Sequence, residues 1–284
     1  MIFDLSIMNK RFASLMSKDF IFMTAPLEDI TDSSYRTLAH KYGADLTFTE
    51  MARLDGLARN NKSTQDRVLI PDDTPTQIQI IGSSESVLKK FLKNFKPTNG
   101  FLGFNLNLGC PSQEMINIGS GCAMIKRVTK VNNMVSLIKS HGYPCSVKLR
   151  LGMNQFEKDK KVYLNLIKSV DADFFVVHTR HGGEGYDVPA DHSVLRECIA
   201  TGKNIIVNGD IKSAEQIQFL KSIGVKGVMI GRAAIPNMAL FNKLKDLPFP
   251  DLNSLREEYI VLAETQKSKP KYRENILTRI KKKY

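Results

Sequence analysis

Residues 204–232, NIIVNGDIKSAEQIQFLKSIGVKGVMIGR, contain the pattern that decides the fold. Two short apolar runs, 204–208 and 227–230, flank a segment from 213 to 224 whose apolar residues recur at helical spacing. The first run shows no alternation of apolar and polar residues, which is typical of a strand buried on both faces. A strand, a helix and a second strand in this order predict a parallel βαβ unit, because the helical crossover returns the chain to the same sheet edge.

The same unit repeats along the chain. Helical patterns also occupy residues 33–43, 84–95, 131–142 and 156–170. The predicted strands cover residues 20–24, 46–50, 76–81, 103–107, 146–149, 174–178, 204–208 and 227–230. Eight strands alternating with helices over about 225 residues match a (β/α)8 TIM barrel of the α/β class. A doubly wound open sheet is the alternative, but no GxGxxG follows the first strand, where a dinucleotide fold would have it.

The strand pattern stops at Pro248-Phe249-Pro250. Residues 251–284 have the pattern of two helices interrupted near Pro270. We therefore predict a TIM barrel over residues 1–246 and a short, basic, helical C-terminal segment over residues 247–284. A chain of 284 residues is long enough for one large α/β domain with such an appendage.

The charge of the chain is strongly positive and unevenly distributed. Lys and Arg number 41 against 29 Asp and Glu, which gives a net charge of +12. Residues 267–284 carry eight Lys or Arg against one Glu, and Ile276, Leu277 and Ile280 recur there at helical spacing. One side of that segment can therefore pack while the other stays basic. The excess favours a polyanionic partner, either nucleic acid or an anionic membrane surface, although a generally Lys-rich composition would also produce it.

Cysteine content and hydropathy narrow the class of protein further. Four scattered cysteines without a CxxC pair favour neither a disulfide scaffold nor a zinc site. No run of eighteen apolar residues occurs, and the amino terminus lacks the order of a signal peptide. We expect a cytoplasmic protein with no membrane span and no metal, and we favour a monomer.

The residues after the predicted strands form a set that a hydrophobic core would not need. Gly209 and Gly231 follow the last two strands, and Arg232 adds a guanidinium beside the second. Glycines there let backbone N–H groups approach a phosphate; the alternative is that both serve only as turn formers. Lys148 lies in an apolar strand and needs an anionic or electron-rich partner. His178 alone would suit a core, but its place at a strand end favours the site.

Cys110 occupies a Gly-Cys-Pro turn at the end of the strand that contains residues 103–107. An ordinary thiol has a pKa of about 8.5, so it is mostly protonated at neutral pH and able to act as an acid. The alternative is a small buried hydrophobic side chain. We prefer that alternative for Cys122, Cys145 and Cys198, which have no comparable setting.

These stretches together resemble the tRNA-dihydrouridine synthase family of flavoproteins. The resemblance extends from about Phe22 to Ile235, and its most specific part is the Asn-x-Gly-Cys-Pro of residues 107–111 with the Gly-x-Gly that follows. The matching stretches are APLEDITDSSYR, QIQIIGS, LNLGCPSQEMINIGSGCAMIK, VKLRLG, VVHTRHGGEGY, IIVNGDI and MIGRAAI.

The resemblance implies a TIM barrel that holds FMN and a helical C-terminal domain that grips tRNA. It also implies reduction of a uridine C5–C6 bond with electrons from NADPH or NADH, and Cys110 as the proton donor to C5. The implied FMN contacts are Pro26, Leu27, Gln79, Lys148, His178, Asn208, Gly209, Asp210, Gly231 and Arg232. The implied groups near the uracil or its phosphates are Asn107, Arg150 and Arg180.

Two departures from the family pattern stand out. Leu27 replaces the usual Met after Pro26, and Glu28 adds a charge where the family has a small residue. The C-terminal segment is also shorter than the usual domain. Two rival functions remain: an FMN barrel acting on a free pyrimidine, as dihydroorotate dehydrogenase-like enzymes do, and a non-catalytic RNA-binding barrel. The basic tail argues against the first, and the presence of Cys110 and Lys148 argues against the second.

Overall fold

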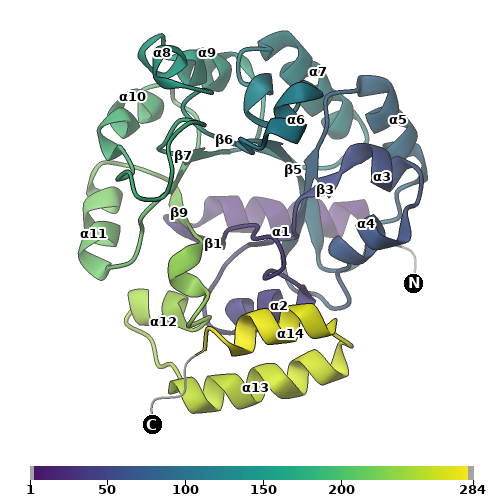
Figure 1. Ribbon diagram of the computed structural model, residues 1–284, viewed down its shortest axis with the longest axis vertical. Helices are drawn as coiled ribbons and strands as arrows, with labels where there is room; N and C mark the ends of the chain where they lie inside the picture. Colours follow the sequence, from purple (N-terminus) through teal and green to yellow (C-terminus); the bar gives the residue numbers. More distant parts are fainter. Residues whose placement is uncertain (1–2, 281–284) are drawn as a thin grey trace.

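The predicted strand runs pair side by side into one parallel sheet that closes on itself (Figure 1). In this computed structural model, which describes residues 3–280, the strand order is β1-β9-β8-β7-β6-β5-β4-β2. A parallel bridge between Met23 and Leu46 joins the two ends of that order, and β3 pairs with β4 beside β2. The strands are β1 (Ile21–Thr24), β2 (Thr47–Phe48), β3 (Ala52–Arg53), β4 (Thr76–Ile81), β5 (Phe101–Leu108), β6 (Cys145–Leu149), β7 (Phe175–His178), β8 (Ile205–Asn208) and β9 (Gly227–Ile230). The predicted (β/α)8 barrel is confirmed.

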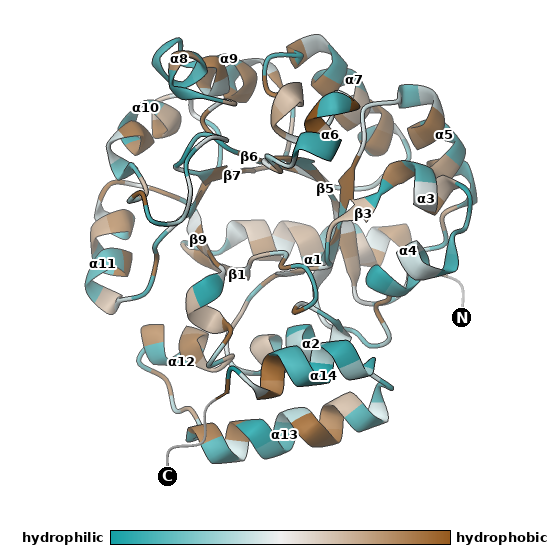
Figure 2. Cartoon of the chain, viewed as in Figure 1, coloured by the Kyte–Doolittle hydropathy of each residue, from teal (hydrophilic) through white to brown (hydrophobic). Residues whose placement is uncertain are grey.

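Helices surround the sheet, with their hydrophobic sides toward the strands (Figure 2). They are α2 (Ser33–Lys41), α3 (Leu54–Ala58), α4 (Lys62–Arg67), α5 (Glu85–Asn94), α6 (Gln113–Asn117), α7 (Val128–Ser140), α8 (Gln155–Asp159), α9 (Val162–Ser169), α10 (Leu195–Ile199), α11 (Ala214–Ser222) and α12 (Leu240–Leu244), with short 3-10 turns η1 (Gly121–Met124), η2 (His192–Val194) and η3 (Arg232–Ala234). The segment 156–170, predicted as one helix, is divided into α8 and α9 because Lys161 adopts a left-handed conformation with φ 53°.

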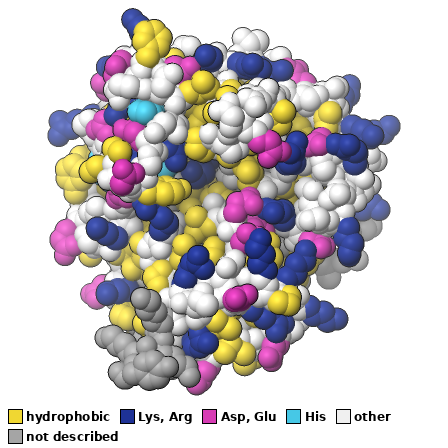
Figure 3. Space-filling model, in the orientation of Figure 1, with side chains coloured by type: hydrophobic (Ala, Val, Ile, Leu, Met, Phe, Trp, Pro, Cys, Tyr) yellow, Lys and Arg dark blue, Asp and Glu magenta, His cyan; other side chains and the backbone are white. Residues whose placement is uncertain are grey.

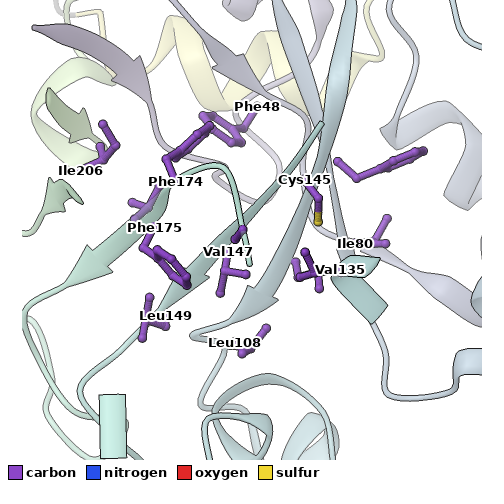
Figure 4. Packing of buried hydrophobic residues seen from close by; sticks show 14 of the residues in the cluster. Phe48, Ile80, Leu108, Val135, Cys145, Val147, Leu149, Phe174, Phe175 and Ile206 are labelled. Atoms are coloured by element: carbon purple, nitrogen blue, oxygen red, sulfur yellow. The ribbon is translucent and has the colours of Figure 1, made fainter. Parts of the chain in front are cut away.

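The strands are buried on both faces, as their continuous apolar sequence predicts. Val147 and Leu149 of β6 lie beside Phe175 of β7 and Leu108 of β5 in one buried cluster (Figure 4). All four are at most 2% exposed. This packing makes the wall of the barrel a rigid support for the loops at its carboxyl end.

A helix to which the sequence analysis assigned no role, α1 (Leu5–Ser17), closes the amino-terminal end of the barrel. Its Phe12 stacks on Phe174, just before β7, with the ring centroids 6.4 Å apart. Arg11 donates to the carbonyls of Asn99 and Asp73, which precede β5 and β4. The opposite, carboxyl end of the barrel is the one left for a site.

The C-terminal segment forms two helices, α13 (Leu252–Thr265) and α14 (Pro270–Leu277); α13 lies beside α2, and α14 packs against α13 (Figure 1). Pro270 is the first residue of α14, where a missing N–H costs nothing. Leu255, Tyr259 and Ile276 are fully buried in the cluster that contains Phe22 of β1. These helices therefore share their hydrophobic packing with the barrel. The boundary at residue 247 stays a prediction, and Lys281, Lys282 and Lys283 lie outside the described residues.

No helix within residues 3–280 is long and apolar enough to cross a membrane. In the same part of the chain, no three His, Cys, Asp or Glu side chains gather in a way that would hold a metal ion.

Candidate active site at the carboxyl end of the barrel

A cavity of about 740 Å³ opens at the carboxyl ends of β7, β8, β9 and β1. In Figure 3, hydrophobic side chains occupy the centre of this face and Lys and Arg side chains surround it. The predicted site residues that line the cavity are Pro26, Leu27, Lys148, His178, Arg180, Asn208, Gly209, Asp210, Gly231 and Arg232. Among the predicted cofactor contacts, only Gln79 is not part of this lining.

The backbone at Gly209 forms one wall of the cavity and cannot carry a side chain. Its φ is +118°, and a Cβ there would lie 2.9 Å from Cβ of Ala190 and 3.1 Å from Cδ2 of His178. Gly231 precedes the short turn η3, which begins at Arg232. The Arg232 side chain is about half exposed, at 49%. Glycine backbone that lines the cavity beside an accessible guanidinium suits a phosphate group.

Asp210 lies between the two arginines of the cavity. Its carboxylate accepts hydrogen bonds from Arg180 Nη2, from the N–H of Ala190 at 2.9 Å and from Arg232 Nη2 at 3.2 Å. Partial burial works against ionisation, but the Ala190 N–H and Arg180 outweigh it and lower the pKa of Asp210. The carboxylate thus stays ionised and orients both guanidinium groups.

His178 is held neutral at the floor of the cavity. Burial, followed by the charges of Lys148 and Arg150, lowers the pKa of His178 to about 2. Arg180 Nη1 lies 3.2 Å from His178 Nε2, so that nitrogen accepts and the ring proton is assigned to Nδ1. Arg180 also donates from Nε to the Val188 carbonyl at 2.6 Å. His178 can therefore serve as a hydrogen-bonding group but not as a cation.

Lys148 projects from β6 into the cavity wall. Burial, reinforced by the charge of Arg150, lowers the pKa of Lys148 to about 8. Within residues 3–280 no carboxylate forms an ion pair with its ammonium group. A cation in this position lowers the free energy of an anionic or electron-rich ligand bound beside it.

Sequence reasoning missed Tyr186, which borders the cavity on the loop after β7. The guanidinium of Arg232 lies 3.9 Å from the centre of the Tyr186 ring, and the ring also stacks near His178. Tyr186 is 58% exposed. An aromatic residue within the Gly-rich stretch 182–186 was the available signal, because such loops carry site residues more often than core residues.

Cys110 lies on the other side of the barrel mouth, in the loop after β5, and is partly exposed. The side-chain oxygen of Asn107 accepts from the N–H of Gly109 at 3.0 Å and from the N–H of Cys110 at 2.9 Å. The carbonyl of Cys110 accepts from the N–H of Cys122 at 3.0 Å. The turn that carries the thiol is thus fixed by hydrogen bonds both to the N–H and to the carbonyl of Cys110.

A ladder of buried amides and a hydroxyl supports Asn107 from inside the barrel. Asn107 donates to Gln79 Oε1 at 2.8 Å, and Gln79 donates to Asn105 Oδ1 at 2.7 Å. Asn105 in turn donates to Ser146 Oγ at 2.7 Å, and Ser146 donates to Gln77. The Gln79 side chain therefore bonds to β5, not to the cavity, and it fixes which way the Asn107 amide points. The sequence shows only that polar residues occur within these strands; it does not indicate the hydrogen bonds of Asn105, Ser146 and Gln77.

Arg150 and Glu28 are likewise engaged with the protein itself. Arg150 Nη1 donates to the carbonyls of His181 at 2.7 Å and Glu184 at 3.0 Å, and its side chain does not line the cavity. Arg150 thereby holds the loop that carries Tyr186. Glu28 forms an ion pair with Arg67 and also lies outside the cavity lining. The charge expected beside the cofactor is therefore neutralised locally.

The chain is a (β/α)8 barrel with a cavity suited to an anionic ligand and a partly exposed thiol, both at the carboxyl end of the strands. This combination is typical of a TIM-barrel enzyme. The family model described as dihydrouridine synthase (Dus) matches residues 23–283. The chain belongs to the dihydrouridine synthase family, and the resemblance predicted from the sequence is confirmed.

Curated relatives agree with this assignment. A protein of Helicobacter pylori named probable tRNA-dihydrouridine synthase is 28% identical over 239 residues, which cover 81% of this chain and 71% of that protein. The probable tRNA-dihydrouridine synthase 2 of Bacillus subtilis is 28% identical and covers 78% and 71%. The tRNA-dihydrouridine synthase B of Pseudomonas putida is 25% identical and covers 81% and 72%.

Solved structures support the fold alone. Morphinone reductase superposes with a TM-score of 0.54 over 85% of this chain and 91% of that one, at 10% sequence identity. This likeness concerns the arrangement of the barrel.

Proposed function

We propose that this chain reduces uridine in tRNA to dihydrouridine, with FMN bound in the cavity and NADPH or NADH as the source of electrons. One observation carries the proposal: the cavity and Cys110 lie at the same end of the barrel. The cavity suits an anionic ligand and occupies one side, and Cys110, held by hydrogen bonds to its backbone, occupies the other. Membership of the family supports the reaction type, and the names of the relatives support tRNA as the substrate.

The residues of the cavity fit FMN. Gly209 and Gly231 bring backbone without side chains to the cavity lining, where a phosphate can approach it, and Arg232 supplies a guanidinium beside them. Lys148 suits the electron-rich edge of a flavin ring, and Pro26 and Leu27 supply apolar contact. When bound, FMN supplies a hydride for the C6 position of the uracil. The protein's own task is to fix the ligand's orientation and to supply the proton.

Cys110 is the proton donor in this proposal. Its Sγ transfers a proton to C5 of the uridine, and the thiolate that remains is reprotonated from solvent because the side chain is partly exposed. Asn107 positions the thiol through the two N–H groups that its side chain binds. Arg150 and Arg180 are buried and hydrogen-bond the loop after β7, so they place Tyr186 over the mouth.

The excess of positive charge supports a nucleic acid substrate. The net charge is +12, and much of it lies in residues 267–284, of which Lys281, Lys282 and Lys283 lie outside the described part. Each phosphate contact by such a residue adds a salt-dependent term to RNA affinity. A free pyrimidine gains little from charge this far from the cavity.

The test is mass spectrometry of nucleosides from tRNA of a strain that lacks the gene. We expect dihydrouridine to disappear from one or more tRNA positions and to return when the wild-type gene is restored. The Cys110→Ala gene serves as the matched control and should not restore it. Unchanged dihydrouridine at every position in the deletion strain would contradict the proposal.

A further inference from the structure

One face of α14 contacts the turn that follows β1. Lys271 and Asn275 lie one helical turn apart and both contact Asp29, and the adjacent Tyr272 contacts Glu50. Lys271 Nζ forms an ion pair with the Asp29 carboxylate at 2.6 Å, and Asn275 Nδ2 donates to the Asp29 carbonyl at 3.0 Å. The Tyr272 hydroxyl donates to Glu50. The basic C-terminal helix is thus bonded directly to a loop of the barrel mouth.

Glu50 connects Tyr272 with the same turn. Its carboxylate is 1% exposed and accepts from Tyr272 on one oxygen and from the N–H of Asp29 on the other. Arg67 Nη1 lies 3.8 Å away. Burial is the largest cause of the raised pKa of Glu50. A buried carboxylate that loses one of two donors is strongly destabilised, so both bonds constrain the backbone of Asp29.

Asp29 lies within the same short turn as Leu27. The turn is closed by hydrogen bonds from the N–H of Thr31 to the Leu27 carbonyl at 3.1 Å and from the N–H of Leu27 to Thr31 Oγ1 at 3.0 Å. Asp29 has a left-handed backbone, with φ 58°. Leu27 lines the cavity next to Gly231, where a Cβ on the glycine would lie 3.7 Å from Leu27 Cδ2. A shift of Asp29 therefore moves a wall of the ligand cavity.

We propose that Tyr272 and Asn275 are positioning residues for uridine reduction, acting through Glu50 and Asp29 on the turn that presents Leu27 to the cavity. This inference rests on the proposed function. It assigns α14 two tasks: it carries part of the basic surface that meets RNA, and it fixes the wall against which the ligand ring and the target base are aligned. A shift of about 1 Å in such alignment can slow a reaction by as much as 10²-fold.

The test uses the full-length protein with Tyr272→Phe and, as a milder variant, Asn275→Ala. The matched control is Tyr42→Phe, because the Tyr42 hydroxyl donates to Glu258 at 2.6 Å and joins α2 to α13 without touching Asp29. Hydrogen exchange of the peptide covering residues 25–32 reports the turn without any ligand. Single-turnover formation of dihydrouridine at saturating tRNA, together with the tRNA dissociation constant, reports the reaction.

We expect exchange in residues 25–32 to accelerate in Tyr272→Phe and Asn275→Ala and to stay unchanged in Tyr42→Phe. The single-turnover rate should fall about tenfold in the first two variants, because alignment is lost while the basic surface is kept, and the dissociation constant should stay within about twofold. Unchanged exchange, an unchanged rate, or an equal loss in Tyr42→Phe would overturn the inference. A wild-type protein that forms no dihydrouridine would instead overturn the proposed function, and the exchange result would still report on the turn.

Discussion

The two halves of the barrel mouth differ in what their polar groups contact. One half, built from β7, β8, β9 and the turn after β1, surrounds the cavity together with Lys148 of the adjoining β6 and keeps the guanidinium of Arg232 accessible. The half built from β4, β5 and β6 bonds its amides to one another, from Gln77 to Asn107, and ends at the backbone of Cys110. The first half is therefore organised to receive an anionic ligand. The second is organised to hold one thiol in place.

This difference predicts that substitutions in the two halves will separate ligand binding from chemistry. Changes in the cavity half should weaken retention of the flavin. Changes in the Cys110 half should leave the flavin bound and slow the reaction. A variant that does both would show that the halves are not independent.

The largest effect is expected at Cys110. In Cys110→Ala no positioned acid remains, and uridine reduction should slow by about 10²–10⁴-fold while flavin stays bound and reducible by NADPH. Single-turnover formation of dihydrouridine measures the rate. Cys198→Ala, at a buried thiol on α10, is the control and should keep the wild-type rate. A wild-type rate in Cys110→Ala would make this residue a structural thiol only.

The next effect concerns Arg232 in the cavity half. Arg232→Ala removes a charge-assisted hydrogen bond to a phosphate, and retention of FMN should weaken by about 1.5–3 kcal/mol, or roughly 10–150-fold in the dissociation constant. Fluorescence titration of the apoprotein with FMN measures it. Arg232→Lys keeps the charge but loses the planar guanidinium, so its affinity for FMN should lie between those of the wild type and Arg232→Ala. Equal affinity in all three proteins would place the phosphate elsewhere.

Asn107 tests the support of the thiol. Asn107→Ala removes the acceptor of two backbone N–H groups and leaves Gln79 without its donor, so we expect a rate loss of about 10-fold with FMN affinity unchanged. Asn107→Asp keeps the acceptor and should recover part of the rate. If FMN affinity falls with the rate, Asn107 contacts the ligand directly, and the contrast between the two halves is weaker than the hydrogen bonds indicate.

The smallest expected effect is a pH dependence from Lys148. Because its pKa is lowered to about 8, the ammonium is mostly charged at pH 7 and mostly neutral at pH 9 in the free protein. An anionic ligand favours the charged form, so FMN affinity should fall as pH rises above 8, by at most about tenfold per unit. Titrations of wild type and Lys148→Met at pH 7 and 9 check it, and the variant should show a smaller change.

The same shift predicts the sign of a stability change in the free protein. Between pH 8 and 10.5 the unfolded chain holds the Lys148 proton that the folded chain has lost. The contribution of Lys148 to the free energy of unfolding therefore increases with pH across that window. For His178, whose pKa is lowered to about 2, the unfolded chain binds a proton below pH 6.5 that the folded chain does not, so its contribution to the free energy of unfolding falls as the pH drops below 6.5.

Much of the barrel could be predicted because its signal is local. Each strand is a short apolar run, and the carboxyl ends of parallel strands meet at one mouth, so the sequence alone groups residues such as Gly209 and Arg232. The direction in which a polar side chain within a strand points could not be predicted in the same way. Gln79 and Lys148 are both polar residues within strands, yet Gln79 bonds to Asn105 and Asn107 while Lys148 faces the cavity. Which partner a buried amide meets depends on register between distant strands.

Long-range contacts account for the other omissions. The role of α1 depends on its packing against Phe174, and the bond from Tyr272 to Glu50 joins residues far apart in the chain. Met8, Phe12 and Leu15 of α1 do recur at helical spacing, but neither contact is marked by a pattern that names its distant partner. The break between α8 and α9 at Lys161 was missed because a left-handed lysine has no turn signature of the kind that glycine or asparagine provides.

The most direct test of the central claim mixes the protein carrying reduced FMN, without oxygen, with unmodified tRNA transcript, with orotate or with free uracil. The proposed function predicts that oxidised flavin absorbance returns only with tRNA and that dihydrouridine forms in equal amount. Reoxidation by orotate or uracil, or no reoxidation by any tRNA, would contradict it.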